Sequence, residues 1–371
     1  MAFIFKIFKW TFKTILVLLG VFPLSKCSPG YREQNGKITF NGKEINDKNF
    51  IVLNDHFAKD DTAIYFKDYI IENADIPTFE ALDAHYAKDK WMVYYCKVER
   101  DAQAYYLTKR NVIFRMKDAD VTTFKLMNGG LDGYAVDKKQ AYFNGVAFVV
   151  EDVQTLQQID GRFVKDQYHV YFDQSPIKMA NPVSFEILNS YYAKDDKRFF
   201  YYGKPYEFYN GIHEIPCDVA SFELLEYPYS KDQASVFYYY TKILKADSKS
   251  FQTLGSHYSK DKNYVFLESE IMNGADPASF SLVPQDEYAT EANYYSRDKN
   301  KVFWKIRSIE KANPDKFKVI GLDYSTDGQN IFYESELLPN VDVLSFEISH
   351  HNYGDSDAKD KNHQYLKGKR L

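Results

Sequence analysis

His213, Glu214 and Asp286 are the side chains of this sequence best suited to acid–base chemistry. The first two lie in residues 204–216 and the third lies in residues 284–293, two segments that interrupt a regular spacing. Because histidine titrates near neutral pH, the three groups would form an acid–base site if the segments met over a pocket. The chain has no G-x-S-x-G elbow, no phosphate-binding glycine loop and no H-E-x-x-H motif. An enzyme is therefore the alternative hypothesis, and the sequence assigns no catalytic, cofactor-binding or metal-binding residue.

Three other histidines follow a repeated pattern. His56, His85 and His257 each precede an aspartate by four residues, at a position that Tyr191 and Tyr294 hold elsewhere. A side chain that alternates with tyrosine in this way is better explained by packing or capping than by metal binding. We expect a structural role for these histidines.

Ten aspartates recur in one local context, usually with a basic residue before them. Calcium sites need several oxygen ligands that converge from a short loop. Each of these turns offers one aspartate beside a lysine that opposes cation binding, so we expect the carboxylate to cap its own turn. These anchor aspartates are Asp60, Asp89, Asp137, Asp166, Asp195, Asp232, Asp261, Asp298, Asp327 and Asp360.

Cysteine chemistry is limited to three residues. Cys96 and Cys217 lie in different repeats and match no zinc-binding spacing. In an exported chain the two thiols could form a disulfide, but sequence alone cannot place them within reach of each other. Cys27 lies in the N-terminal segment.

The anchor aspartates reveal the elements that carry these groups. Their commonest spacing is 29 residues, with exceptions of 33, 37 and 48. An aromatic residue stands three positions before most anchors and five positions after all of them, as in Tyr258 and Phe266 around Asp261. A fixed period of this size indicates a tandem repeat protein.

Each repeat predicts short strands joined by turns. Triplets such as Val265–Leu267 favour a strand with both faces covered, and the Lys-Asp segment before them is typical of a turn. Asp75, Asp247 and Asp276 are expected to cap single helical turns. The predicted fold is an all-β tandem repeat array of short strands and hairpins with single-turn helical segments. The alternative is an array of α+β repeats.

The repeats resemble the DKNYY family of bacterial proteins. The motif is closest at Asp261-Lys262-Asn263-Tyr264-Val265-Phe266 and at Asp298-Lys299-Asn300-Lys301-Val302-Phe303. Asp89-Lys90-Trp91 and Asp60-Asp61-Thr62 depart from it. The resemblance covers roughly residues 36–366, and it implies an exported or envelope-associated protein with no assigned activity.

The N-terminal segment predicts export. In residues 1–27, three lysines precede an apolar run, which is typical of a signal peptide or an N-terminal membrane anchor. Leu24-Ser25-Lys26-Cys27 resembles the lipid-attachment box of bacterial lipoproteins, although Lys26 departs from it, so lipidation of Cys27 is a further hypothesis. Residues 28–35 are predicted to be a tether.

The rest of the chain is predicted to be the repeat array, residues 36–371. Residues 36–57 are expected to form a degenerate N-terminal cap, because the terminal units of repeat arrays are usually atypical. Residues 358–371 are expected to form half a repeat.

Composition narrows the choice of partners. The net charge is −5 with both signs mixed, so there is no basic stripe of the kind that nucleic-acid binding needs. Tyrosine alone accounts for 32 residues. We therefore expect a non-catalytic repeat protein of the bacterial envelope that binds or scaffolds through an extended aromatic-rich surface. Its ligand would be a protein, or a glycan stacked on exposed tyrosines.

Overall fold

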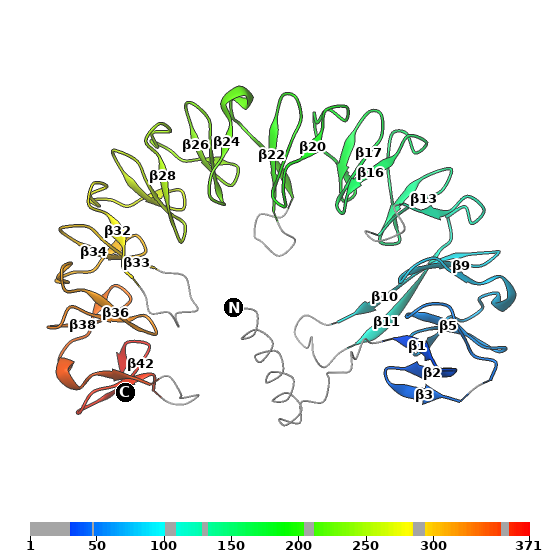
Figure 1. Ribbon diagram of the computed structural model, residues 1–371, viewed down its shortest axis with the longest axis horizontal. Helices are drawn as coiled ribbons and strands as arrows, with labels where there is room; N and C mark the ends of the chain where they lie inside the picture. The colour runs from blue at the N-terminus through cyan, green and yellow to red at the C-terminus, as the bar shows by residue number, and fades with distance from the viewer. Residues whose placement is uncertain are drawn as a thin grey trace, which may run out of the picture. The chain divides into compact units, whose positions relative to one another are not determined.

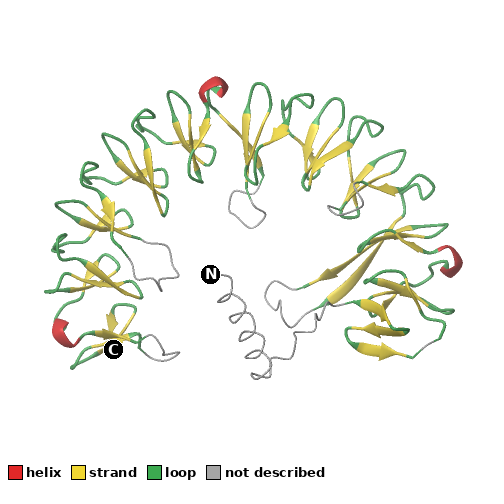
Figure 2. Ribbon diagram, viewed as in Figure 1, coloured by secondary structure: helices red, strands yellow, loops and turns green. Residues whose placement is uncertain are grey.

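The computed structural model describes residues 30–46, 48–100, 109–127, 133–203, 211–284, 294–349 and 356–371. The chain divides into two compact units, residues 1–183 and 184–371, here called the N-terminal and C-terminal units. Both are all-β (Figures 1 and 2). The predicted signal segment with Cys27 lies outside the described residues, as does Asp286.

The described residues of the N-terminal unit form a three-stranded sheet, β1–β3, followed by four four-stranded sheets. Its strands are β1 (Tyr31–Gln34), β2 (Lys37–Phe40), β3 (Lys43–Ile45), β4 (Ile51–Val52), β5 (Phe57–Lys59), β6 (Ile64–Phe66), β7 (Tyr69–Ile70), β8 (Glu80–Ala81), β9 (Tyr86–Lys88), β10 (Val93–Glu99), β11 (Arg110–Met116), β12 (Lys125–Leu126), β13 (Tyr134–Val136), β14 (Ala141–Phe143), β15 (Val146–Phe148), β16 (Gln157–Asp160), β17 (Phe163–Lys165), β18 (Val170–Phe172) and β19 (Ser175–Pro176).

In the C-terminal unit the described residues form six four-stranded sheets. Its strands are β20 (Glu186–Ile187), β21 (Tyr192–Lys194), β22 (Phe199–Tyr202), β23 (Ile212–Ile215), β24 (Glu223–Leu224), β25 (Tyr229–Lys231), β26 (Val236–Tyr238), β27 (Thr241–Lys242), β28 (Gln252–Gly255), β29 (Tyr258–Lys260), β30 (Val265–Leu267), β31 (Glu270–Ile271), β32 (Ser281–Leu282), β33 (Tyr295–Arg297), β34 (Val302–Trp304), β35 (Arg307–Ser308), β36 (Lys318–Gly321), β37 (Tyr324–Thr326), β38 (Ile331–Tyr333), β39 (Glu336–Leu337), β40 (Glu347–Ile348), β41 (Ala358–Lys359), β42 (Gln364–Leu366) and β43 (Lys369–Arg370).

Every four-stranded sheet is an antiparallel meander of consecutive strands, so each repeat contributes one sheet. The anchor aspartate follows the second strand and begins the turn to the third. We call the end of the sheet with this turn the anchor end. The turns between strands one and two, and between strands three and four, lie at the opposite end, the loop end, because neighbouring strands run in opposite directions.

The third strand is buried on both faces, as its sequence predicts. Val265 and Phe266 point to opposite faces of β30, and both have an exposed fraction of 0%. Val265 packs with Tyr258 and with Phe303 of the following sheet, whereas Phe266 packs with Tyr229 and Phe251 on the preceding side. The core of each unit therefore lies between successive sheets, where each repeat covers its neighbour.

Helical structure in the described residues is confined to single 3-10 turns, η1 (Ile76–Thr78), η3 (Val219–Ser221) and η4 (Val343–Ser345). Asp75 caps η1 as predicted, and its side chain accepts a hydrogen bond from the Thr78 amide. These short turns confirm the all-β array and exclude α+β repeats from the described chain. No helix among the described residues has the length and apolar character needed to cross a membrane.

The two ends of the predicted array differ from their expected boundaries. β1 begins at Tyr31 and pairs with β2, so an ordered strand occupies part of the segment predicted to be a tether. Tyr31 packs on Phe40, with 4.7 Å between ring centroids, and its amide donates to the carbonyl of Asp55. At the other end residues 358–371, predicted to be half a repeat, supply β41–β43, and the earlier strand β40 completes their four-stranded sheet.

Candidate functional site

The anchor aspartate is a buried acceptor that joins three parts of its repeat. At Asp166, one carboxylate oxygen accepts from the amides of Tyr168 and His169 at 2.8 and 2.7 Å. The other oxygen accepts from the Tyr171 hydroxyl at 2.8 Å and from two amides of the segment that precedes the sheet. Asp166 is 2% exposed. The carboxylate thus caps its own turn, as predicted, and also holds the connection from the previous repeat.

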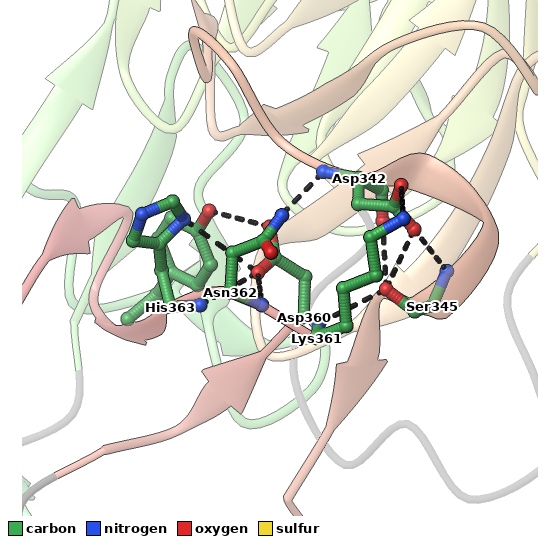
Figure 3. A network of polar contacts seen from close by, with 7 residues as sticks. Asp342, Ser345, Asp360, Lys361, Asn362 and His363 are labelled. Atoms are coloured by element: carbon green, nitrogen blue, oxygen red, sulfur yellow. Dashed lines mark hydrogen bonds and ion pairs between the residues drawn. The ribbon is translucent and has the colours of Figure 1, made fainter.

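A second aspartate extends this network at the anchor end. In the last repeat, Asp342 caps η4 and accepts from Ser345, while its other oxygen lies 2.8 Å from the Lys361 ammonium (Figure 3). Asp360 accepts from the Asp342 amide at 3.0 Å. The same pairing of a capping aspartate with the lysine after the anchor occurs in four more repeats, at Asp75–Lys90, Asp120–Lys138, Asp247–Lys262 and Asp276–Lys299.

These bonds change the acidity of the anchors. A hydrogen bond from Tyr65, with others from Thr62 and Ala63, lowers the pKa of Asp60 to about 2. Burial by itself would raise the pKa of Asp360, but hydrogen bonds from the Asp342, Asn362 and His363 amides and from the Tyr365 hydroxyl lower it to about 2. Asp60 and Asp360 are therefore charged in the folded chain at neutral pH.

We expect the folded chain to lose stability on acidification between about pH 4 and pH 2. The folded pKa of Asp60 and Asp360, about 2, lies below the ordinary value of 3.8. Such groups contribute stability above the ordinary pKa, and this contribution is lost as the pH falls through the folded value. Circular dichroism during acid titration measures the effect. A stability that stays constant down to pH 2 would contradict it.

The basic residue before the anchor is structural as well. Lys165 and Lys260 donate to the carbonyls of Pro182 and Pro277 at 2.7 and 3.0 Å. Because the aspartates are occupied by amides, hydroxyls and lysines, they do not converge on a cation. No group of three or more histidine, cysteine, aspartate or glutamate residues suited to a metal occurs in the described chain.

The tyrosine three residues before the anchor joins consecutive sheets. The Tyr258 hydroxyl donates to the Tyr294 carbonyl at 2.9 Å, and the Tyr134 hydroxyl donates to the carbonyls of Arg162 and Asp173 at 2.9 Å. The acceptors lie in loop-end turns of the next sheet. Consecutive loop ends within a unit are therefore tied together and form one edge. Other tyrosines that make this contact are Tyr86, Tyr192, Tyr229 and Tyr295.

Departures from the regular repeat occur at loop ends. The longer anchor spacings arise between β10 and β11, β12 and β13, β22 and β23, β32 and β33, and β40 and β41. Each of these connections joins strands one and two or strands three and four of its sheet. The turn that contains the anchor aspartate keeps its length throughout. The predicted insertion 204–216 includes β23, which is the fourth strand of its sheet.

Aromatic rings gather at the loop ends of sheets β20–β23 and β24–β27. We call this group the tyrosine cluster, and it comprises Tyr191, Tyr201, His213, Tyr227, Tyr239 and Tyr240. His213 stacks on Tyr240 with 4.0 Å between ring centroids and an interplanar angle of 14°. Tyr191 stacks on Tyr227, also at 4.0 Å. The Tyr239 ring lies 5.8 Å from that of Tyr227 and 5.1 Å from that of buried Tyr201.

The structure does not bring the predicted acid–base residues His213 and Glu214 together on one face. His213 and Glu214 are neighbours on β23, where they pair with Tyr201 and Phe200, so their side chains point to opposite faces. Glu214 lies 3.7 Å from Arg198, and burial lowers the pKa of His213. Asp286 lies outside the described residues, so its distance from either group is not defined.

The other histidine and cysteine candidates in the described chain pack or form hydrogen bonds within the fold. His85 interacts with the Cys96 carbonyl at 2.8 Å, and its ring lies 6.0 Å from that of His56. Cys96 and Cys217 are free thiols in different core clusters, and burial raises the pKa of Cys217 to about 11.

The sequence analysis did not single out the tyrosine cluster. Tyr227, Tyr239 and Tyr240 occupy positions where other repeats have residues such as Ser256, Glu268 and Ser269. Their signal was the appearance of tyrosine outside the positions at which the repeat needs an aromatic residue. That signal was obscured because tyrosine is abundant throughout the chain.

Comparison with known proteins agrees with the repeat architecture. The chain matches the model of the DKNYY family over residues 6–97, 98–241 and 229–369. No curated protein and no solved structure gave a match. The matched segments cover most of the chain, and the repeats at Asp261, Asp298 and Asp360 carry the Asp-Lys-Asn motif in register. The chain therefore belongs to the DKNYY family.

Proposed function

We propose that this chain is a non-catalytic binding or scaffolding protein, exported to the bacterial envelope, that engages its partner through the loop ends of its sheets. The observation that supports the proposal is the one-sided placement of the departures from the repeat. Loops on a rigid scaffold are where binding residues usually lie, and insertions in repeat arrays tend to mark the binding face.

The anchor ends, unlike the loop ends, keep the same structure from repeat to repeat. Their carboxylates, lysines and hydroxyls form the same hydrogen-bonded network in successive repeats, as Asp360 and Asp342 illustrate. Groups committed to such a network hold the scaffold together. This division assigns stability to the anchor end and recognition to the loop end.

The proposal includes export of the chain and its attachment to the membrane. The lysines and apolar run of residues 1–27 support a signal peptide or membrane anchor, and Cys27 supports a lipid attachment. The mass of the mature N-terminus from fractionated cells distinguishes these forms. A lipid on Cys27 or an intact Met1 in the membrane fraction would mean attachment, and a free terminus near Ser28 would mean release.

Blocking substitutions at the two ends of the same sheets test the recognition surface. Ser190→Trp and Ser269→Trp add bulk to exposed loop-end turns of sheets β20–β23 and β28–β31. Lys197→Trp and Asn263→Trp do the same at the anchor end of these sheets. We expect the full chain to bind isolated envelopes of the producing cells, and the loop-end variants to bind at least about tenfold more weakly.

The anchor-end variants are the matched controls. They should bind like the unsubstituted chain, because the proposed surface does not include them. Equal loss in both pairs, with the fold retained by circular dichroism, would contradict recognition through loop ends. An unsubstituted chain that does not bind envelopes at all would contradict the binding function.

A further inference from the structure

The tyrosine cluster has features that the repeat does not require. In the other repeats the positions of Tyr227, Tyr239 and Tyr240 hold mostly small or polar residues, and those repeats form the same four-stranded sheet. Tyr239 also has a φ of 56°, a left-handed conformation that is unfavourable for a bulky side chain. The equivalent positions in that conformation hold polar, non-aromatic residues: Lys67, Asn144, Asp173, Glu268, Lys305, Glu334 and Lys367. The fold alone therefore does not explain three tyrosines here.

The rings of the cluster form two platforms at the protein surface. His213 with Tyr240 makes one near-parallel pair, and Tyr191 with Tyr227 makes the other. All four rings are half-buried, which leaves part of each at the surface on a fixed support. Tyr201 is fully buried beneath them, and its hydroxyl lies 3.3 Å from that of Tyr227. Packing thus fixes the orientation of the rings before any ligand arrives.

In the described turns around these rings, the polar groups other than Glu226 are neutral. The turn at Asn189 and Ser190 contributes an amide and a hydroxyl, and the tyrosines contribute phenol hydroxyls. In the described turns that carry the cluster, Glu226 is the one acidic or basic side chain. Burial lowers the pKa of His213, which favours its uncharged form. A phosphorylated or otherwise anionic ligand would call for arginine or lysine, which these turns do not supply.

We propose that the tyrosine cluster is a binding site for a neutral glycan, with pyranose rings stacked on its two platforms. A pyranose has faces of C–H groups and a rim of hydroxyls. It therefore matches a surface of aromatic faces with phenol and amide groups beside them. Rigid tyrosines lose little conformational entropy on binding, which favours recognition by a preformed surface. The inference rests on the proposed function and specifies the ligand of one loop-end site.

Titration of the full chain with neutral oligosaccharides tests this site, with tyrosine fluorescence as the readout. The probes are the tetrasaccharides of β-1,4-linked glucose, β-1,4-linked N-acetylglucosamine and α-1,4-linked glucose. We expect at least one tetrasaccharide to bind. The double variant Tyr227→Ala/Tyr240→Ala should bind it with an affinity at least about tenfold lower. The double variant Tyr227→Phe/Tyr240→Phe keeps both platforms and should retain most of the affinity. This variant tests the site even if the alanine variant fails to fold.

Tyr168→Ala is the matched control, because Tyr168 is an exposed tyrosine at the anchor end of another sheet. It should leave glycan binding unchanged, and equal weakening by this variant would overturn the site. Absence of binding to all three tetrasaccharides, or binding of a polyproline peptide in their place, would overturn the glycan assignment. If envelope binding still depended on Ser190 and Ser269 in that case, the proposed function would stand and only this inference would fail.

Discussion

Replacing Asp166 with alanine is expected to lower the free energy of unfolding of the N-terminal unit by about 4 kcal/mol. The substitution removes an acceptor that is 2% exposed and leaves its donors without it, among them the amides of Tyr168, His169 and Asp152. Buried donors that lose their acceptor incur a desolvation penalty that solvent cannot offset. Urea unfolding followed by tyrosine fluorescence measures the change, and hydrogen exchange locates it.

Asp118→Ala provides the control in the same unit. Asp118 is exposed, so its substitution should change the unfolding free energy by no more than about 0.5 kcal/mol. Asp166→Asn should fall between the two, because the amide keeps one acceptor oxygen but turns a donor toward the other amides. If Asp166→Ala cost as little as Asp118→Ala, the anchor would not be the group that holds the repeat together.

Tyr258→Ala is expected to destabilise the C-terminal unit by about 4 kcal/mol, whereas Tyr258→Phe should cost only about 1 kcal/mol. Tyr258 is 0% exposed and packs against Val265, Phe280 and Phe303. The alanine variant loses this packing and leaves a cavity between two sheets. The phenylalanine variant loses only the hydrogen bond to the Tyr294 carbonyl and the contact with Ser296.

The same denaturant titration tests both variants, with Tyr168→Ala as the exposed control. Phe57 and Phe163 occupy the equivalent position in two repeats, so the phenylalanine variant should preserve the fold. A result in which both Tyr258 variants lost equal stability would show that the hydroxyl, and not the ring, carries the contact between sheets. That outcome would contradict a core formed mainly by packing between successive repeats.

Interpretation of single-residue effects depends on the repeat architecture. Each sheet packs against its immediate neighbours, so stability is distributed along the array and local unfolding is expected. A substitution at Asp166 should increase exchange first in sheet β16–β19. A substitution at Tyr258 should do so in sheets β28–β31 and β32–β35, which share the contact.

Much of the scaffold could be predicted because its determinants are local and occur many times. An aspartate caps its own turn through amides two and three residues later, and a β-branched residue next to an aromatic favours a strand regardless of distant contacts. Repetition separates such signals from chance. The anchor turns, the doubly buried third strand and the capping role of Asp75 follow from this information.

Other features required contacts between residues far apart in sequence. The Tyr134 hydroxyl bonds to carbonyls 28 and 39 residues away, and no local pattern identifies those acceptors. The strand Tyr31–Gln34 within the predicted tether depends on pairing of β1 with β2 and on contact of Tyr31 with Asp55, which no local pattern indicates. Which tyrosines reach the surface also depends on such contacts, because many repeat tyrosines are buried between sheets.

By itself, the sequence determined that this protein is an all-β array of about 29-residue repeats built on anchor aspartates. Those features depend on turn capping and strand propensity, which act over a few residues. Only the tertiary structure decided that the strands flanking the longer connections are joined at loop ends, that His213 and Glu214 point to opposite faces, and that the tyrosine cluster forms. These outcomes depend on strand direction and on packing between successive sheets, which place residues from separate repeats beside one another.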